Sequence, residues 1–246
     1  MSNRNLEDYE NNYRDKDHYD FEKFQVKYRR RNILELLKRN NHGRILEVGS
    51  GVDPLFSYLD DYNSYTVVEP SEEFFSIAKN LAGDDQRILL FHDYIENITV
   101  DEKYDFIVIS SLLHEIENGE TVLNAIKNLS HQGTVVYLNV PNAKSFHRLL
   151  ALEAGIVGSI YNKSSNQIKF QQAHTYDIVS LEELVVACGF SVIESGSYFI
   201  KPFTHSQMRL LLAADIIGDD VLEGLDSMVK YCPDLGSEIF MTCKVN

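Results

Sequence analysis

Cysteine is scarce in this 246-residue sequence, which contains only Cys188, Cys232 and Cys243. These three form no Cys-x-x-Cys pair, so neither a disulfide framework nor a structural zinc site is expected. Long apolar runs are also missing, because no stretch approaches the ~18 apolar residues of a membrane-spanning helix. The first 15 residues are polar and unlike a signal sequence. We therefore expect a cytoplasmic protein that is not embedded in a membrane.

Basic side chains are the minority among the charged residues. Lys and Arg number 23 against 37 Asp and Glu, which gives a formal net charge of −14 at pH 7. Nucleic acids and acidic lipids bind basic patches, so this charge disfavours both as partners. Hydrophobic residues still make up 44% of the chain, which is enough for a full core. A globular protein with a small-molecule partner is the better expectation.

Short apolar runs alternate with helical stretches along most of the chain. The runs predict strands at residues 44–48, 65–68, 87–91, 106–110, 134–140, 190–200 and 237–245. Apolar residues at helical spacing predict helices at residues 19–39, 54–59, 71–81, 120–129 and 180–188. This alternation is typical of βαβ units around a parallel sheet, so we expect a doubly wound α/β fold.

The pattern predicts one domain with additions. Residues 1–43 would form a loose or partly ordered arm and a cap helix, and residues 44–246 the α/β domain. After the fifth strand the alternation is interrupted by residues 142–178, an insertion of the length that often forms a lid or a substrate wall. A second insertion, residues 204–231, is expected to hold two helices broken near Gly218.

The loop after the first predicted strand is the most informative part of the sequence. Gly49 and Gly51 have no Cβ, so the backbone here can approach a ligand closely. The next predicted strand ends in Glu69, about 20 residues downstream, where a carboxylate can accept hydrogen bonds from two ribose hydroxyls. The spacing therefore predicts a nucleoside ligand.

Two nucleoside ligands compete for this pattern. A dinucleotide site needs a third glycine at the position that Pro54 occupies here. The carboxylate of Glu47 would also repel the pyrophosphate of NAD, whereas it would suit a cationic ligand. An NAD(P)-dependent oxidoreductase is therefore the weaker alternative.

These motifs resemble those of class I S-adenosylmethionine-dependent methyltransferases. Residues 47–51 resemble the first motif of this family, and residues 67–70 resemble the second. Residues 104–116 resemble the fourth motif, and residues 133–142 resemble the fifth strand. The resemblance implies a Rossmann-like, mostly parallel, seven-stranded sheet whose last two strands form an antiparallel hairpin. It also implies S-adenosylmethionine (SAM) as cofactor and S-adenosylhomocysteine (SAH) as product. One departure is Asp53, which replaces a small residue of the first motif.

The resemblance also implies which residues bind SAM. The first-motif loop would hold the methionine part and Glu69 the ribose, while Asp93 would face the adenine amino group. A tyrosine of the N-terminal segment would cover the cofactor, whereas the arginines at 29–31 are expected on a solvated helix face. The implied cofactor residues are Glu47, Gly49, Ser50, Gly51, Glu69, Pro70, Asp93, Tyr94, Ser110, Tyr19 and Tyr28.

Two histidines are candidates for the base that takes a proton from the methyl acceptor. His114 follows the fourth predicted strand, at the sheet edge where doubly wound folds bind ligands, and His174 ends the first insertion. The competing interpretations are a packing role for His114 and a surface loop for His174. Either histidine could serve a hydroxyl nucleophile.

The acceptor itself is not encoded in a recognisable motif. We expect a small-molecule hydroxyl rather than an amine, as in methyltransferases of surface-polysaccharide or secondary-metabolite pathways.

Ser111, His114 and Glu115 supply only one carboxylate, so no metal requirement is expected. A noncatalytic SAM-binding subunit is a further alternative, and a homodimer is compatible with the sequence.

Overall fold

The computed structural model describes residues 5–13, 16–40 and 43–246, with residues 13 and 16–20 described by their backbone alone. A seven-stranded sheet runs through the described residues in the order β3-β2-β1-β4-β5-β7-β6. Its strands are β1 (Arg44–Val48), β2 (Ser64–Val68), β3 (Ile88–Phe91), β4 (Tyr104–Ser110), β5 (Ser130–Pro141), β6 (Phe190–Tyr198) and β7 (Glu238–Val245). β7 is antiparallel to β5 and β6, and the other pairs are parallel. The predicted sheet with its antiparallel hairpin is confirmed.

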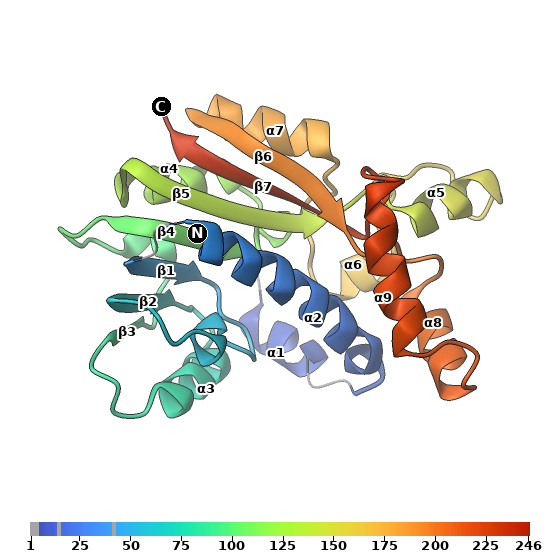
Figure 1. Cartoon of the computed structure of the whole chain (residues 1–246), viewed down its shortest axis with the longest axis horizontal. Coiled ribbons are helices and arrows are strands. Elements are labelled where there is room, and N and C mark those ends of the chain that lie inside the picture. The colour runs from blue at the N-terminus through green and yellow to red at the C-terminus, as the bar shows by residue number, and fades with distance from the viewer. Residues whose placement is uncertain (1–4, 14–15, 41–42) are drawn as a thin grey trace.

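Helices surround this sheet (Figure 1). In the described part they are α1 (Leu6–Tyr13), α2 (Lys16–Arg39), α3 (Glu72–Ala82), α4 (Gly119–Asn128), α5 (Phe146–Glu153), α6 (Ser165–Lys169), α7 (Ile178–Ala187), α8 (His205–Ala213) and α9 (Asp219–Ser227). Short 3₁₀ turns are η1 (Leu55–Tyr58), η2 (Ile95–Asn97), η3 (Leu113–Glu115) and η4 (Met228–Lys230). Among the described helices, none combines the length and apolar character that crossing a membrane requires.

Neighbouring residues of the central strands pack against opposite faces of the sheet. Ile45 of β1 belongs to the core that includes α2, whereas Leu46 belongs to the core that includes α4 and α7. Phe106 and Ile107 of β4 divide in the same way. All four side chains are fully buried. Because helices cover both faces, the central strands are continuously apolar, and this is the pattern that made them predictable.

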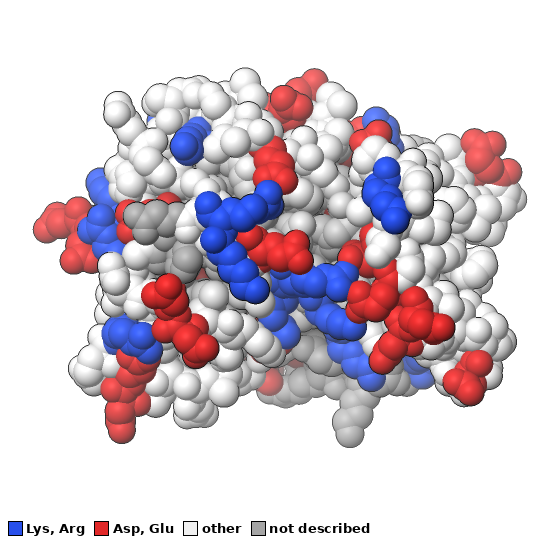
Figure 2. Space-filling view, viewed as in Figure 1, with Lys and Arg blue, Asp and Glu red and all other residues white. Residues whose placement is uncertain are grey.

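The long helix α2 lies across one face of the sheet (Figure 1). Its charged side is held by α9, because Glu223 accepts from Lys27 and from Arg31 at 2.7 Å each and Asp226 pairs with Arg31. Figure 2 shows the basic side chains gathered over α2 with acidic ones beside them. The 204–231 insertion, which contains α8 and α9, therefore packs against the cap helix.

Local capping shifts the bounds of some predicted helices. Asp177 is the N-cap residue of α7. Its side chain accepts from Ser180 N at 2.9 Å, and the Ser180 hydroxyl accepts from Asp177 N at 3.0 Å. The helix thus starts at Ile178, before the predicted cap at Ser180. Only the short turn η1 forms within the helix predicted at 54–59. In the N-terminal segment, predicted as a loose or partly ordered arm, residues 6–13 form α1.

Candidate functional site

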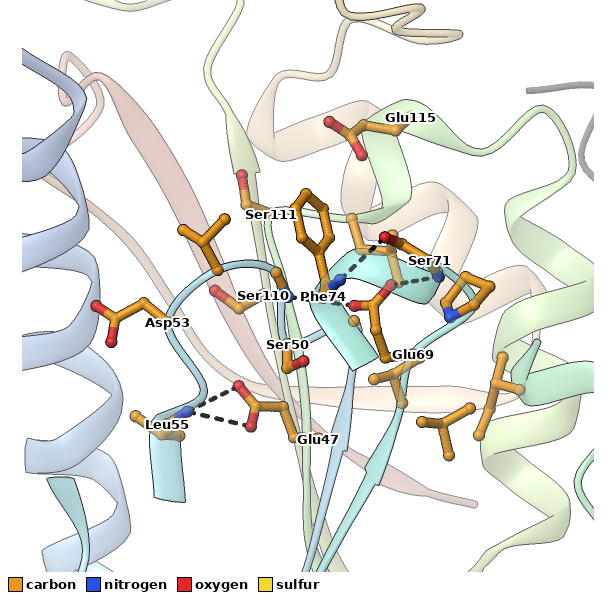
Figure 3. Close-up of a pocket in the computed structure, with 18 of the residues that line it drawn as sticks. Glu47, Ser50, Asp53, Leu55, Glu69, Ser71, Phe74, Ser110, Ser111 and Glu115 are labelled. Atoms are coloured by element: carbon orange, nitrogen blue, oxygen red, sulfur yellow. Dashed lines mark hydrogen bonds between the residues drawn. The ribbon is translucent and has the colours of Figure 1, made fainter. Parts of the chain in front are cut away.

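A pocket lies at the carboxyl ends of β1, β2 and β4 (Figure 3). Its wall contains the loop 49–53 after β1, Glu69 and Pro70 after β2, and Ser110 and Ser111 at the end of β4. Parallel strands bring these ends to one edge, where doubly wound folds bind ligands. The structure therefore brings together the three segments that the motifs singled out.

The loop after β1 turns through two glycines in the left-handed region. Gly49 has a φ of 77° and Gly51 a φ of 56°, which other residues adopt only with strain. Gly49 N donates to Val68 O at 2.9 Å, so the loop is tied to β2. The Ser50 hydroxyl is buried and has no hydrogen-bond partner within the described part of the chain. The loop thus presents backbone and one hydroxyl to a ligand.

Glu47 lies beneath this loop rather than pointing freely into the pocket. Its two oxygens accept the backbone N–H of Leu55 at 3.1 and 3.2 Å (Figure 3), and Oε2 also accepts the Tyr65 hydroxyl at 2.9 Å. Burial raises the pKa of Glu47 to about 8, although both partners oppose that shift. The carboxyl group therefore fixes the start of η1 and binds a proton near neutral pH. This weakens the sequence argument that its negative charge selects the ligand.

Glu69 is the carboxylate that backbone groups hold at the pocket wall. Oε2 accepts from Gly51 N at 3.2 Å, and Oε1 accepts from Ser71 N at 2.9 Å (Figure 3). The residue is only 4% exposed and follows the last residue of β2 directly. Two N–H donors from separate segments therefore fix the orientation of this carboxylate at the edge where a ribose is predicted.

The turn after β3 contributes Tyr94 to the pocket, together with Ile95 and Glu96. Asp93 is not part of the described wall, because its Oδ1 accepts from Tyr94 N and from Asn97 Nδ2, both at 2.7 Å. These hydrogen bonds lower the pKa of Asp93. Asp93 therefore shapes the turn that carries Tyr94, and its contact with adenine stays a prediction.

The two histidines predicted as bases lie outside the described wall of the pocket. His114 is 3% exposed, and its Nε2 lies 3.8 Å from Oε1 of Glu115. His174 N donates to the carbonyl of His114 at 2.9 Å, and its ring nitrogen Nε2 lies 2.9 Å from the carbonyl of Glu117. Both histidines thus join the turn after β4 to the end of the insertion, and their role as bases stays a prediction.

Tyr28, one of the two cap-helix tyrosines predicted to bind the cofactor, is not among the residues that line the pocket. Tyr28 is buried in the core, where its ring stacks on Phe199 at 4.7 Å between centroids. Glu223 accepts a long 3.4 Å hydrogen bond from its hydroxyl. Tyr28 faces the core because it lies on the apolar side of α2. The side chain of Tyr19 lies outside the described residues.

Helix α1 supplies the tyrosine that covers the pocket, and the sequence analysis missed it. Leu6 and Tyr9, three residues apart, both line the pocket. The Tyr9 hydroxyl donates to Glu115 at 2.9 Å, and the Ser71 hydroxyl donates to Glu10 at 2.6 Å. Helix α1 is therefore attached to the turns after β4 and β2, on both sides of the opening. The helical spacing of Leu6 and Tyr9 was the sequence signal that could have identified this helix.

Helix α2 forms another wall of the pocket through Glu22, Arg29 and Arg30. Arg29 is half-buried and donates to Glu238 at 2.9 Å and to Glu22 at 3.1 Å. Arg30 pairs with Asp53 of the glycine loop. The expectation of a solvated arginine face was wrong, because each of these arginines has a carboxylate partner on another element or turn.

Among the described residues, no group of His, Cys, Asp and Glu is arranged to hold a metal ion.

Comparison with known proteins identifies similar domains. A family model described as a methyltransferase domain matches residues 17–195. No curated protein sequence matches. The sequence match spans the glycine loop, β2 and the turn after β4, which are the segments that build the pocket.

Several solved structures share the fold at low sequence identity. A SAM-dependent methyltransferase of Thermotoga maritima, described as a possible histamine N-methyltransferase, has a TM-score of 0.62 and 16% identity, covering 91% of this chain and 90% of its own. The N-methyltransferase NodS of Bradyrhizobium japonicum has a TM-score of 0.59 and 11% identity, with coverages of 92% and 98%. NodS has also been solved with SAH.

Proposed function

The chain belongs to the SAM-dependent methyltransferase family, and from this premise we propose that it methylates a small molecule bound in the pocket of Figure 3. The observation that carries the proposal is the joint placement of the loop 49–51 and Glu69. Gly51 N donates to the carboxylate of Glu69, so the two motifs form one rigid surface. Such a surface suits a nucleoside with an amino-acid tail.

Each part of SAM then has a proposed contact in this pocket. The backbone of loop 49–51 and the Ser50 hydroxyl would bind the methionine part, and Glu69 the two ribose hydroxyls. Tyr94 would lie beside the adenine, in the turn that Asp93 shapes. Pro70 and Ser110 complete the wall, and Tyr9 covers the opening.

Methyl transfer itself requires little chemistry from the protein. The carbon on a sulfonium is already activated, so the protein's contribution is to hold the nucleophile in line with the departing sulfur. Positioning of this kind contributes up to ~7–11 kcal/mol in favourable model reactions. The side chains of Leu6 and Tyr9 of α1 at the pocket wall would help to keep water away from the reacting atoms. We propose a hydroxyl or an amine as nucleophile. The N-methyltransferase relatives support the amine, whereas the sequence analysis favoured the hydroxyl.

Titration calorimetry with SAM, SAH and NADH tests this proposal. We expect saturable 1:1 binding of SAM and SAH and no binding of NADH. Binding of NADH without SAM would contradict the proposal and restore the oxidoreductase alternative. SAM binding without SAH formation from any acceptor would instead favour the noncatalytic subunit. Cytoplasmic location remains a prediction from the sequence.

A further inference from the structure

A chain of polar groups leads away from the pocket through the cap helix. Glu22 of α2 lines the pocket, and its Oε2 lies 3.0 Å from Nε2 of His205, the first residue of α8. On the other side of the imidazole ring, Nδ1 of His205 lies 3.0 Å from Nζ of Lys201. Glu22 is far in sequence from Lys201 and His205, and none of the three belongs to the motifs. They form a hydrogen-bonded chain from the pocket wall to the start of α8.

Buried neighbours fix this chain in place. Lys201 is 3% exposed and donates to Oε1 of Gln25 at 3.0 Å, while Nε2 of Gln25 is 3.3 Å from Glu238. Arg29 links Glu238 to the other oxygen of Glu22. Burial lowers the pKa of Lys201 to about 8, so its ammonium form still dominates at neutral pH.

The hydrogen-bond roles follow from the chemistry of the three groups. An ammonium group can only donate, so Nδ1 of His205 accepts from Lys201. In the neutral imidazole the other nitrogen, Nε2, then carries the proton and donates to Glu22. Glu22 is thus held as a carboxylate that accepts from Arg29 and from His205.

The charge of the pocket indicates what this carboxylate meets. Besides Glu47, which binds a proton near neutral pH, the described acidic residues of the wall are Glu22, Asp53, Glu69, Glu96 and Glu115. The described basic ones are Arg29 and Arg30, and each is paired with a carboxylate. An excess of carboxylates raises the local concentration of cations and disfavours anionic acceptors. A protonated amine is therefore better matched to this wall than a neutral alcohol or a phosphate.

We propose that Glu22 binds an amine acceptor in its ammonium form and takes its proton, with His205 and Lys201 as positioning residues behind it. This inference rests on the proposed methyltransferase function and names its substrate class. The ammonium gives one proton to the Glu22 carboxylate, which frees the nitrogen lone pair. That lone pair forms the N–CH₃ bond while the CH₃–S bond breaks and its electrons stay on sulfur. The products are a methylated ammonium, SAH and one proton, which is later released to solvent.

The experiment combines calorimetry with an SAH-formation assay on the full chain. The probes are benzylamine, histamine and 2-phenylethylamine, with benzyl alcohol and 2-phenylethanol as matched alcohols. The variants are Glu22→Gln, Glu22→Asp and His205→Gln. Glu223→Gln is the matched control, because Glu223 also accepts from basic residues of α2 but lies outside the described pocket wall.

We expect SAH formation with at least one amine and none with the matched alcohols. Glu22→Gln should lower kcat/KM for the amine at least 100-fold while the Kd for SAM stays within twofold, and Glu22→Asp should recover part of the loss. His205→Gln should lower kcat about 10-fold or more with little change in KM, whereas Glu223→Gln should match the wild type. A merely structural role would change the Kd for SAM and KM together.

Three outcomes would overturn this inference and leave the proposed function standing. The first is transfer to the alcohols, or to none of the amines, by a protein that binds SAM. The second is wild-type amine kinetics in Glu22→Gln. The third is a Kd for SAM raised more than 10-fold by Glu22→Gln in a protein that still melts cooperatively, which would assign Glu22 to the cofactor. Failure to bind SAM at all would refute the proposed function itself.

Discussion

Replacement of Glu69 by Gln is the most informative single change in the cofactor pocket. Both oxygens of Glu69 accept backbone hydrogen bonds, from Gly51 N at 3.2 Å and Ser71 N at 2.9 Å. A glutamine has one oxygen and one NH₂ group, so one of these N–H groups would face another donor. The side chain would also lose the charge that makes its hydrogen bonds to ribose hydroxyls strong.

The size of the effect follows from the strength of such hydrogen bonds. A hydrogen bond to a charged group contributes about 1.5–3 kcal/mol. At about 1.4 kcal/mol for each factor of ten, the Kd for SAM should rise roughly 10- to 150-fold in Glu69→Gln. The same rise is expected for 5′-methylthioadenosine, which keeps the ribose but lacks the amino-acid part.

Titration calorimetry with both ligands measures this change. Glu72→Gln is the control, because Glu72 lies three residues away and its side chain is 77% exposed. We expect the control to bind SAM as the wild type does. A Glu69→Gln variant that melts like the wild type and binds both ligands within twofold of it would show that the ribose lies elsewhere.

Three further perturbations test other parts of the pocket. Gly49→Val should raise the Kd for SAM at least 10-fold, because the left-handed φ of 77° disfavours valine and its Cβ would lie 3.4 Å from Leu112. Gly155→Val has a similar φ with open space around it, and an equal loss of SAM binding there would contradict this reasoning. The folded-state pKa of Glu47, about 8, exceeds the unfolded value of about 4.3, so its contribution to stability should fall as pH rises between these values. Glu47→Gln should therefore melt increasingly above the wild type from pH 5 to pH 8, and a constant difference in Tm would refute the assignment. Tyr9→Phe removes a hydrogen bond to a buried carboxylate and should weaken docking of α1 by about 1.5–3 kcal/mol, seen as faster amide exchange in α1. Unchanged exchange would show that this hydrogen bond does not hold the helix.

Local signals in the sequence were sufficient for the sheet and for part of the pocket. The apolar runs of β1 and β4 were readable because both faces of the sheet are covered. Gly49, Gly51 and Glu69 could be found because each lies directly after a strand, where position in the chain determines position in the site. Their hydrogen bonds to neighbouring backbone groups follow from that placement.

Residues brought to the pocket by long-range packing could not be found in this way. Tyr9 and Glu22 reach the wall because α1 and α2 fold back over the sheet edge, and periodicity alone does not specify that docking. His114 was chosen for its place after β4, yet it is buried beside Glu115 and lies outside the described wall. Tyr28 was chosen for its chemistry, but the apolar side of α2 places it in the core.

A crystal structure of the protein with SAH tests the central assignment most directly. The account predicts the nucleoside in the pocket of β1, β2 and β4, with both ribose hydroxyls on Glu69 and the amino-acid part along loop 49–51. A ligand bound away from this loop, or with its ribose outside hydrogen-bonding distance of Glu69, would contradict it.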